Sequence, residues 1–135
     1  WLEGFRGDVA EMQRVVKRPL ERIVAGVAVD DEERTRVRIA EARVRDGIRA
    51  PQLREPRLDA AIAEARGRGV EVVVLGEPDR NRNLQPETAA AIASLVATPG
   101  VVRITVRSLP PGRRGEVSVV LEGGADSRSV VLPSE

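Results

Sequence analysis

The sequence predicts an α/β fold, with a mixed β-sheet, packed helices, an N-terminal helical segment and antiparallel strands at the C-terminus. Three patterns support this prediction. Residues 56–77 read as one helix followed by one buried strand, and residues 8–27 have helical periodicity. From residue 101 onward, apolar and polar residues alternate as they do in half-buried strands.

The helix predicted from residue 56 has clear start and stop signals. Pro56 suits a first turn, and the segment Arg-Gly-Arg-Gly at 66–69 favours an end, because Gly adopts positive φ and Arg is favourable near terminal carbonyls. One apolar stripe should lie on the sheet: Leu58, Ala61, Ile62 and Ala65. The strand that follows is interrupted only by Glu71, which favours cover on both faces: Val70, Val72, Val73, Val74 and Leu75.

The segment 8–27 predicts an amphipathic helix that starts at Asp8, with Glu11 completing a capping box. Its apolar face is formed by residues spaced three or four apart: Met12, Val16, Leu20, Ile23 and Val27. Pro19 should kink this helix or begin a second one. We therefore expect a helical segment at 1–30, packed on its own domain or serving as a stalk, and an α/β domain at 31–135.

Residues 31–45 predict a second helix, with acidic residues at its start and Asp46-Gly47 at its end. The competing interpretation is a strand, because Thr35, Val37 and Ile39 alternate with Arg36 and Arg38. Residues 48–53 should be extended, since Pro51 disfavours helix at the residue before it.

The remaining elements follow the same rules. A polar loop leads to a helix that opens at Pro86 and stops at Pro99-Gly100. Strands are predicted around 102–106, 117–121 and 129–132, with a turn at 110–112.

Composition limits the possible functions. The chain has 135 residues with 22 basic and 21 acidic side chains, so no long-range field favours a nucleic-acid partner. Trp1 and Phe5 are its only aromatic residues, so the core must be aliphatic. His, Cys and Tyr are absent, which excludes Ser-His-Asp and Cys-His nucleophiles and histidine-ligated zinc.

The best candidate site follows the central strand. Oxygen-bearing side chains recur at every second residue and are joined by a later carboxylate: Glu77, Asp79, Asn81, Asn83 and Glu87. This spacing resembles the start of an EF-hand loop and predicts Ca²⁺ or Mg²⁺ binding, although Leu84 and Ala90 replace the expected Gly and Glu. The alternative is a solvated strand-to-helix loop whose Asn side chains satisfy turns.

The segment 34–57 holds eight Arg against Glu41, Asp46 and Glu55. Such a run is typical of contact with anionic lipid or nucleic acid. No aromatic residue is present to stack on a base, so we favour a solvated face that pairs with the acidic segment before it.

The segment 44–78 resembles small actinobacterial membrane-associated α/β domains related to the TPM family. Asp46-Gly47-Ile48 and Ala50-Pro51 match the first element of that pattern, and Ala65 to Leu75 match the second. The resemblance implies a domain tethered at the membrane and facing outward, with metal binding or phosphatase activity in some members. Residues 65–72 also resemble a phospholipase-D-like half domain that lacks its His-Lys-Asp motif and would be non-catalytic.

We expect a non-enzymatic sensing or protein-interaction module of a membrane-tethered protein, with the anchor outside this segment and a divalent cation as candidate ligand. The expected location is extracytoplasmic, with a cytoplasmic location as the alternative. The alternative function is a metal-dependent phosphohydrolase that uses the 77–87 loop, with Arg80 or Arg82 on the substrate phosphate. The sequence predicts a protein partner and indicates no oligomeric state.

Overall fold

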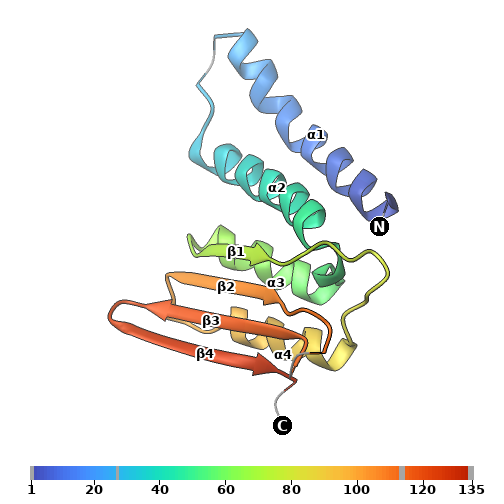
Figure 1. Ribbon diagram of the computed structural model, residues 1–135. Coiled ribbons are helices and arrows are strands. Elements are labelled where there is room, and N and C mark those ends of the chain that lie inside the picture. Colours follow the sequence, from blue (N-terminus) through green and yellow to red (C-terminus); the bar gives the residue numbers. More distant parts are fainter. Residues whose placement is uncertain (1, 27, 113–114, 134–135) are drawn as a thin grey trace. The chain divides into compact units, whose positions relative to one another are not determined.

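The computed structural model describes residues 2–26, 28–112 and 115–133 (Figure 1), so Trp1 and Val27 lie outside the described residues. The elements are α1 (Leu2–Val24), α2 (Asp31–Arg49), the 3₁₀ helix η1 (Pro51–Leu53), α3 (Pro56–Gly67), β1 (Glu71–Leu75), α4 (Pro86–Val96), β2 (Arg103–Ser108), β3 (Val117–Gly123) and β4 (Asp126–Leu132). The predicted α/β class, with a mixed sheet, N-terminal helices and C-terminal antiparallel strands, is confirmed.

The chain divides into two compact units, which we call the helical unit (residues 1–48) and the sheet unit (residues 49–135). The division follows Ile48, whereas the sequence pattern predicts a boundary after residue 30. In the structure, α2 belongs to the helical unit together with α1.

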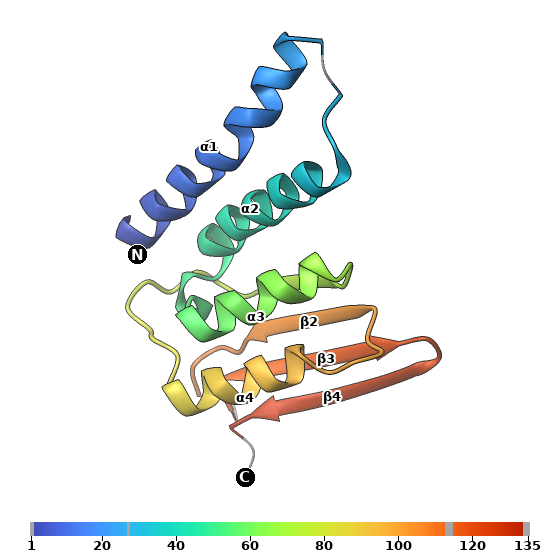
Figure 2. The same cartoon turned by 180° about the vertical axis from the view of Figure 1, so that it is seen from behind.

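The sheet unit has two layers. Its strand order is β1-β2-β3-β4, with β1 and β2 parallel and the other pairs antiparallel. α4 forms the crossover between the parallel strands, and α3 and α4 cover the same face of the sheet (Figure 2). The aliphatic core predicted from composition lies between these layers, and its largest fully buried members are Leu58, Ile92, Ile104, Val96, Val106, Val117 and Val119.

β1 is an edge strand, and within the sheet unit α3 and α4 lie on one face of the sheet (Figure 2), so the prediction of a strand covered on both faces is wrong there. Val72 and Val74 are buried against the helices, whereas Val73 and Leu75 on the other face are half-buried. Val70 packs on the core but precedes the strand. A run of β-branched residues is favourable in any β-strand, so it does not indicate whether one or both faces of the strand are covered.

The starts of α2 and α3 follow the sequence signals. Asp30 Oδ1 accepts a hydrogen bond of 2.7 Å from the Glu33 backbone N–H, which caps α2. The Glu55 carboxylate accepts from the backbone N–H groups of Arg57 and Leu58 at the start of α3. Residues 31–45 are therefore helical, and the alternative strand interpretation is wrong.

Two predicted helix boundaries are corrected. α1 begins at Leu2, so Asp8 lies inside the helix and is not its N-cap; it is buried, and its Oδ1 lies 3.2 Å from Arg43 Nε on α2. α2 runs through Asp46-Gly47 to Arg49, and residues 51–53 form η1 instead of an extended connection. The break occurs at Ala50, with φ −144° and ψ 69°, as expected for the residue before a proline.

Ion pairs connect α1 to α2 within the helical unit. Besides Asp8 and Arg43, the Arg22 guanidinium lies 3.3 Å from the buried Glu33 carboxylate and 3.6 Å from Asp30. α1 continues through Pro19, whose ring is buried. No helix in the described residues is long and apolar enough to cross a bilayer.

β4 begins at Asp126, earlier than the predicted 129–132. Asp126 to Ser129 are all exposed and polar, so they show no alternation, yet their backbone pairs with β3 along the full strand. The pairing is set by the short turn between Gly123 and Asp126 and not by burial.

Gly123 lies close to the backbone of the loop before β2, and a substitution can test this contact in the sheet unit. A Cβ at this position would lie 2.5 Å from the Gly100 carbonyl oxygen in the loop before β2. We expect Gly123→Ala to lower the free energy of unfolding by about 1–3 kcal/mol, because the backbone must shift. Urea denaturation measures this, and Glu122→Ala, which adds no new Cβ, should change it by less than about 0.5 kcal/mol. Equal effects of the two variants would contradict the tight contact.

Candidate functional site

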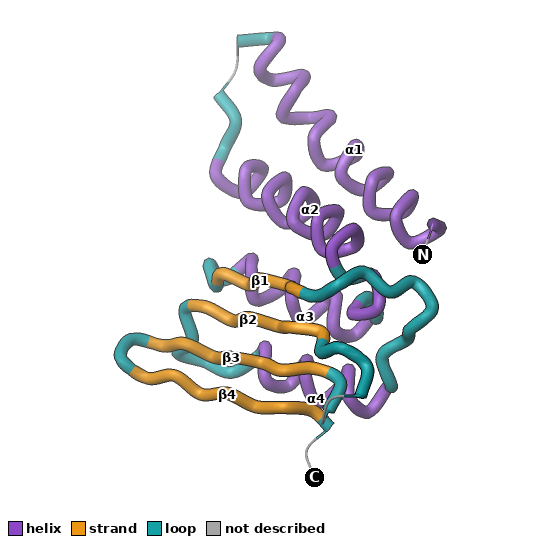
Figure 3. The backbone as a smooth tube through the Cα atoms, viewed as in Figure 1, coloured by secondary structure: helices purple, strands orange, loops and turns teal. Residues whose placement is uncertain are grey.

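The candidate site lies where the parallel strands β1 and β2 end. Figure 3 shows the loops after these strands leaving the same edge of the sheet. Open α/β sheets bind ligands at this edge, because the carboxyl ends of parallel strands and the loops that follow them converge there. The residues after β1, 76–85, are named the strand-end loop.

A buried glutamine from η1 holds the strand-end loop. Gln52 Nε2 donates hydrogen bonds to the Glu77 carbonyl oxygen at 2.7 Å and to Ser108 Oγ at 3.0 Å. Its Oε1 accepts from the Asp79 backbone N–H at 3.1 Å. The amide thus pairs with a carbonyl and an N–H two residues apart, as a neighbouring strand would. We call this set of three bonds the Gln52 clamp.

Local sequence explains why Gln52 points into the site. Pro51 starts η1, and the Leu53 N–H donates to the Ala50 carbonyl, so three residues turn tightly. Leu53 is buried in the aliphatic core, which fixes the orientation of the turn. Gln52 itself is 5% exposed and is therefore held in one position.

Gly76 lets the loop pass over the end of β2. It has φ 151°, and a Cβ built on it would lie 2.8 Å from Ser108 Cβ. Only glycine fits this conformation and this spacing. The close approach brings the loop backbone to Gln52.

Two further contacts fix the loop. Asp79 Oδ1 accepts a hydrogen bond of 3.1 Å from the Asn81 N–H, which closes an Asx turn. Arg82 Nη1 donates to the Leu109 carbonyl oxygen at 2.7 Å and so ties the loop after β1 to the loop after β2.

The predicted metal ligands are placed as follows. Glu77, Asn81, Asn83 and Glu87 are exposed and Asp79 is half-buried. Glu77 contributes its backbone carbonyl to the clamp, Asp79 its carboxylate to the turn, and Glu87 lies in the first turn of α4. Among the described residues, no group of three or more acidic side chains is arranged to hold a metal ion. Ca²⁺ or Mg²⁺ binding by these residues therefore stays a prediction.

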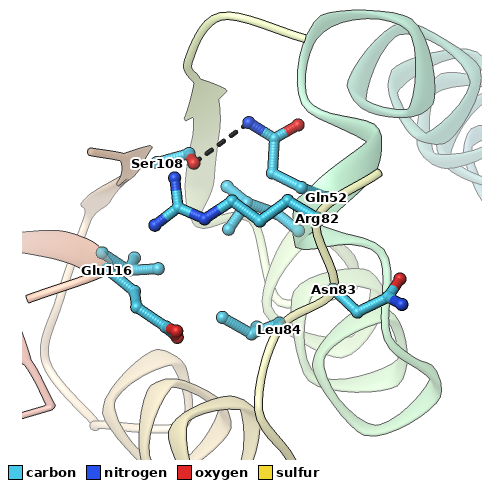
Figure 4. A pocket seen from close by; sticks show the side chains of 8 residues that line it. Gln52, Arg82, Asn83, Leu84, Ser108 and Glu116 are labelled. Carbon is cyan, nitrogen blue, oxygen red and sulfur yellow. Dashed lines mark hydrogen bonds between the residues drawn. The ribbon is translucent and has the colours of Figure 1, made fainter. Parts of the chain in front are cut away.

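A small pocket with a volume of about 10 Å³ lies beside the clamp (Figure 4). It is lined by Gln52, Leu53, Arg82, Asn83, Leu84, Ser108, Glu116 and Val117. Glu116 Oε2 is buried and accepts no hydrogen bond from a described residue. The lining of the pocket is mostly apolar, with the Arg82 guanidinium and the Glu116 carboxylate at its wall.

Sequence reasoning missed Gln52, Ser108 and Glu116. Each comes from a different segment, and the hydrogen bonds of Gln52 span 25 and 56 residues of chain. A polar residue between Pro51 and Leu53 was the only available signal. Asn83 and Arg82 were among the predicted functional residues and do line the pocket.

Comparison with known proteins identifies no relative: no family model, no curated protein and no solved structure matches this chain.

The clamp makes a specific prediction about the loop. Gln52→Ala should lower the free energy of unfolding of the sheet unit by about 1–3 kcal/mol, because buried polar groups lose their partner. The same change should speed hydrogen exchange of the Asp79 amide. Mass spectrometry or NMR measures the exchange.

The matched control is Gln85→Ala. The Gln85 side chain is exposed and forms no cap hydrogen bond at α4, so its removal should leave both quantities unchanged. Unchanged exchange at Asp79 in Gln52→Ala would show that the clamp does not hold the loop.

Proposed function

We propose that this chain is a non-enzymatic sensing or protein-interaction module of a membrane-tethered, extracytoplasmic protein, anchored by a segment outside the chain. The observation that carries the proposal is the Gln52 clamp. It fixes the backbone of the strand-end loop while the side chains of Glu77, Arg80, Asn81 and Asn83 stay exposed.

A fixed loop with exposed polar side chains suits recognition of another macromolecule. Binding loses less conformational entropy when the loop is already ordered, and functional residues concentrate on loops that a rigid scaffold positions. Three anchors act on this loop: the clamp, the Asx turn at Asp79 and the Arg82 bond to Leu109. The side chains between the anchors form a surface for a protein partner.

The chemistry of the site favours binding over catalysis. The chain has no His, Cys or Tyr, and polar groups at the strand ends are engaged in holding the loops. The membrane tether and the outward location are supported by the resemblance of residues 44–78 to TPM-related domains.

Site-specific photo-cross-linking tests the protein partner. A benzophenone side chain at Asn81, introduced in the protein within its host cells, should give one or a few discrete adducts. Adding Gln52→Ala should weaken these adducts several-fold, because the loop loses its fixed conformation.

Ser127 provides the control position, since it is exposed on β4 at the end of the sheet remote from the strand-end loop. The same adducts from positions 81 and 127, or from both backgrounds at position 81, would contradict recognition by the loop.

The alternative function is divalent-cation binding, with metal-dependent hydrolysis of a phosphate ester as the corresponding activity. It is favoured by the position of Asp79, Asn81 and Asn83 after β1 and by Arg82 at the pocket beside them. Arg82 or Arg80 would then contact the substrate phosphate.

Calorimetry tests divalent-cation binding through the melting temperature of the protein. Ca²⁺ or Mg²⁺ at about a hundred times its dissociation constant should add roughly 2.7 kcal/mol to stability and raise the melting temperature by several degrees. Asp79→Asn should abolish the increase, because it removes the charge but keeps the oxygen that accepts from Asn81. An unchanged midpoint with Ca²⁺, Mg²⁺ and Mn²⁺ would exclude this alternative.

A further inference from the structure

The helical unit leaves large apolar side chains exposed on α1. Leu20, Ile23 and Val24 are 53%, 62% and 88% exposed, and Leu2 is 51% exposed at the other end of the helix. Among the described residues of this unit, the buried apolar side chains are only those of Pro19 and Ala40. The unit therefore contains little core of its own, and its apolar face is available for a partner.

An apolar groove continues this face toward α2. It has a volume of about 770 Å³ and is lined by Pro19, Ile23, Val29 and Val37, with Arg34 and Arg38 contributing to its wall. Ile23 thus belongs both to the exposed face of α1 and to the groove. The volume is in the range that accommodates a small molecule or part of a lipid chain.

The charges around the groove indicate the kind of partner. Arg38 forms no ion pair with any residue that the structure describes, and Arg34 forms one of 3.8 Å with the fully exposed Asp31, which solvent weakens. The nearby Asp30 and Glu33 share the single guanidinium of Arg22, which offsets one of their two negative charges. On α1, Arg6 and Lys17 also lack ion pairs within the described chain. Apolar surface bordered by guanidinium groups complements an anionic amphiphile.

We infer that this face of the helical unit lies on an anionic phospholipid bilayer, with acyl chain in the groove and Arg34 and Arg38 on the phosphates. The inference rests on the membrane association in the proposed function and adds a contact made by this chain itself. Amphipathic helices with Lys and Arg beside an apolar stripe bind in this way, and each such cation strengthens the attraction to anionic lipid. A second copy of the same face is the competing occupant, and sedimentation distinguishes it from a bilayer.

Vesicle flotation with residues 1–135 tests the inference. The protein should float with vesicles of phosphatidylcholine and phosphatidylglycerol but not with pure phosphatidylcholine, and high salt should reduce binding. Arg38→Glu should lower the partition coefficient roughly tenfold. Arg36→Glu is the matched control, since residues two apart on a helix point to opposite sides and Arg36 does not line the groove.

A second pair of variants tests the contribution of the apolar side chains of α1 to vesicle binding. Leu20→Ser combined with Ile23→Ser should abolish flotation, whereas Val131→Ser, which alters an exposed apolar residue on β4, should not. Circular dichroism confirms that each variant keeps its helix content.

Several outcomes would overturn the inference. These are the absence of binding to anionic vesicles, equal loss in Arg38→Glu and Arg36→Glu, or a dimer in sedimentation that the Leu20 and Ile23 changes dissociate without any vesicle binding. The cross-linking at Asn81 does not depend on contact between α1 and a vesicle. A negative flotation result would therefore overturn the bilayer contact and leave the recognition of a partner by the strand-end loop to be tested by cross-linking.

Discussion

The side-chain amide of Gln52 is the interaction on which the candidate site depends. It joins η1, the loop after β1 and the end of β2, which are far apart in sequence. Because the amide is buried and uses both its donor and acceptor groups, the loop backbone has the hydrogen bonds that a further strand would supply. The exposed side chains of Glu77, Asn81 and Asn83 therefore project from a backbone that is already fixed.

The two units are held by different forces. The sheet unit is held by aliphatic burial between one face of the sheet and α3 and α4, which is non-directional and strong. The helical unit relies on the ion pairs of Asp8 with Arg43 and of Glu33 with Arg22, and it buries few apolar side chains. Its exposed apolar residues are the basis of the proposed contact with a bilayer, whereas the apolar core of the sheet unit is buried between its two layers.

The sequence patterns correctly predicted those elements whose formation depends on residues close together in the chain. Pro56, the valine run of β1 and the alternation in β2 and β3 depend on neighbouring residues, so the fold class and these elements could be predicted. Asp8 has the side chain of a cap, but its partner Arg43 lies on another helix, and Gly47 lies in a helix that ends only before Pro51. The location of the site at the strand ends was predictable from topology, whereas Gln52 and Ser108 meet only through tertiary contacts.

The backbone order parameters of Glu77, Asp79 and Asn81, measured by ¹⁵N relaxation on the unmodified chain, test the central claim most directly. A loop held by the Gln52 clamp should give values of about 0.85, like those of the strands beside it. Values below about 0.6 would show that the loop moves freely on the nanosecond timescale. That result would contradict a preformed recognition surface at the end of the sheet.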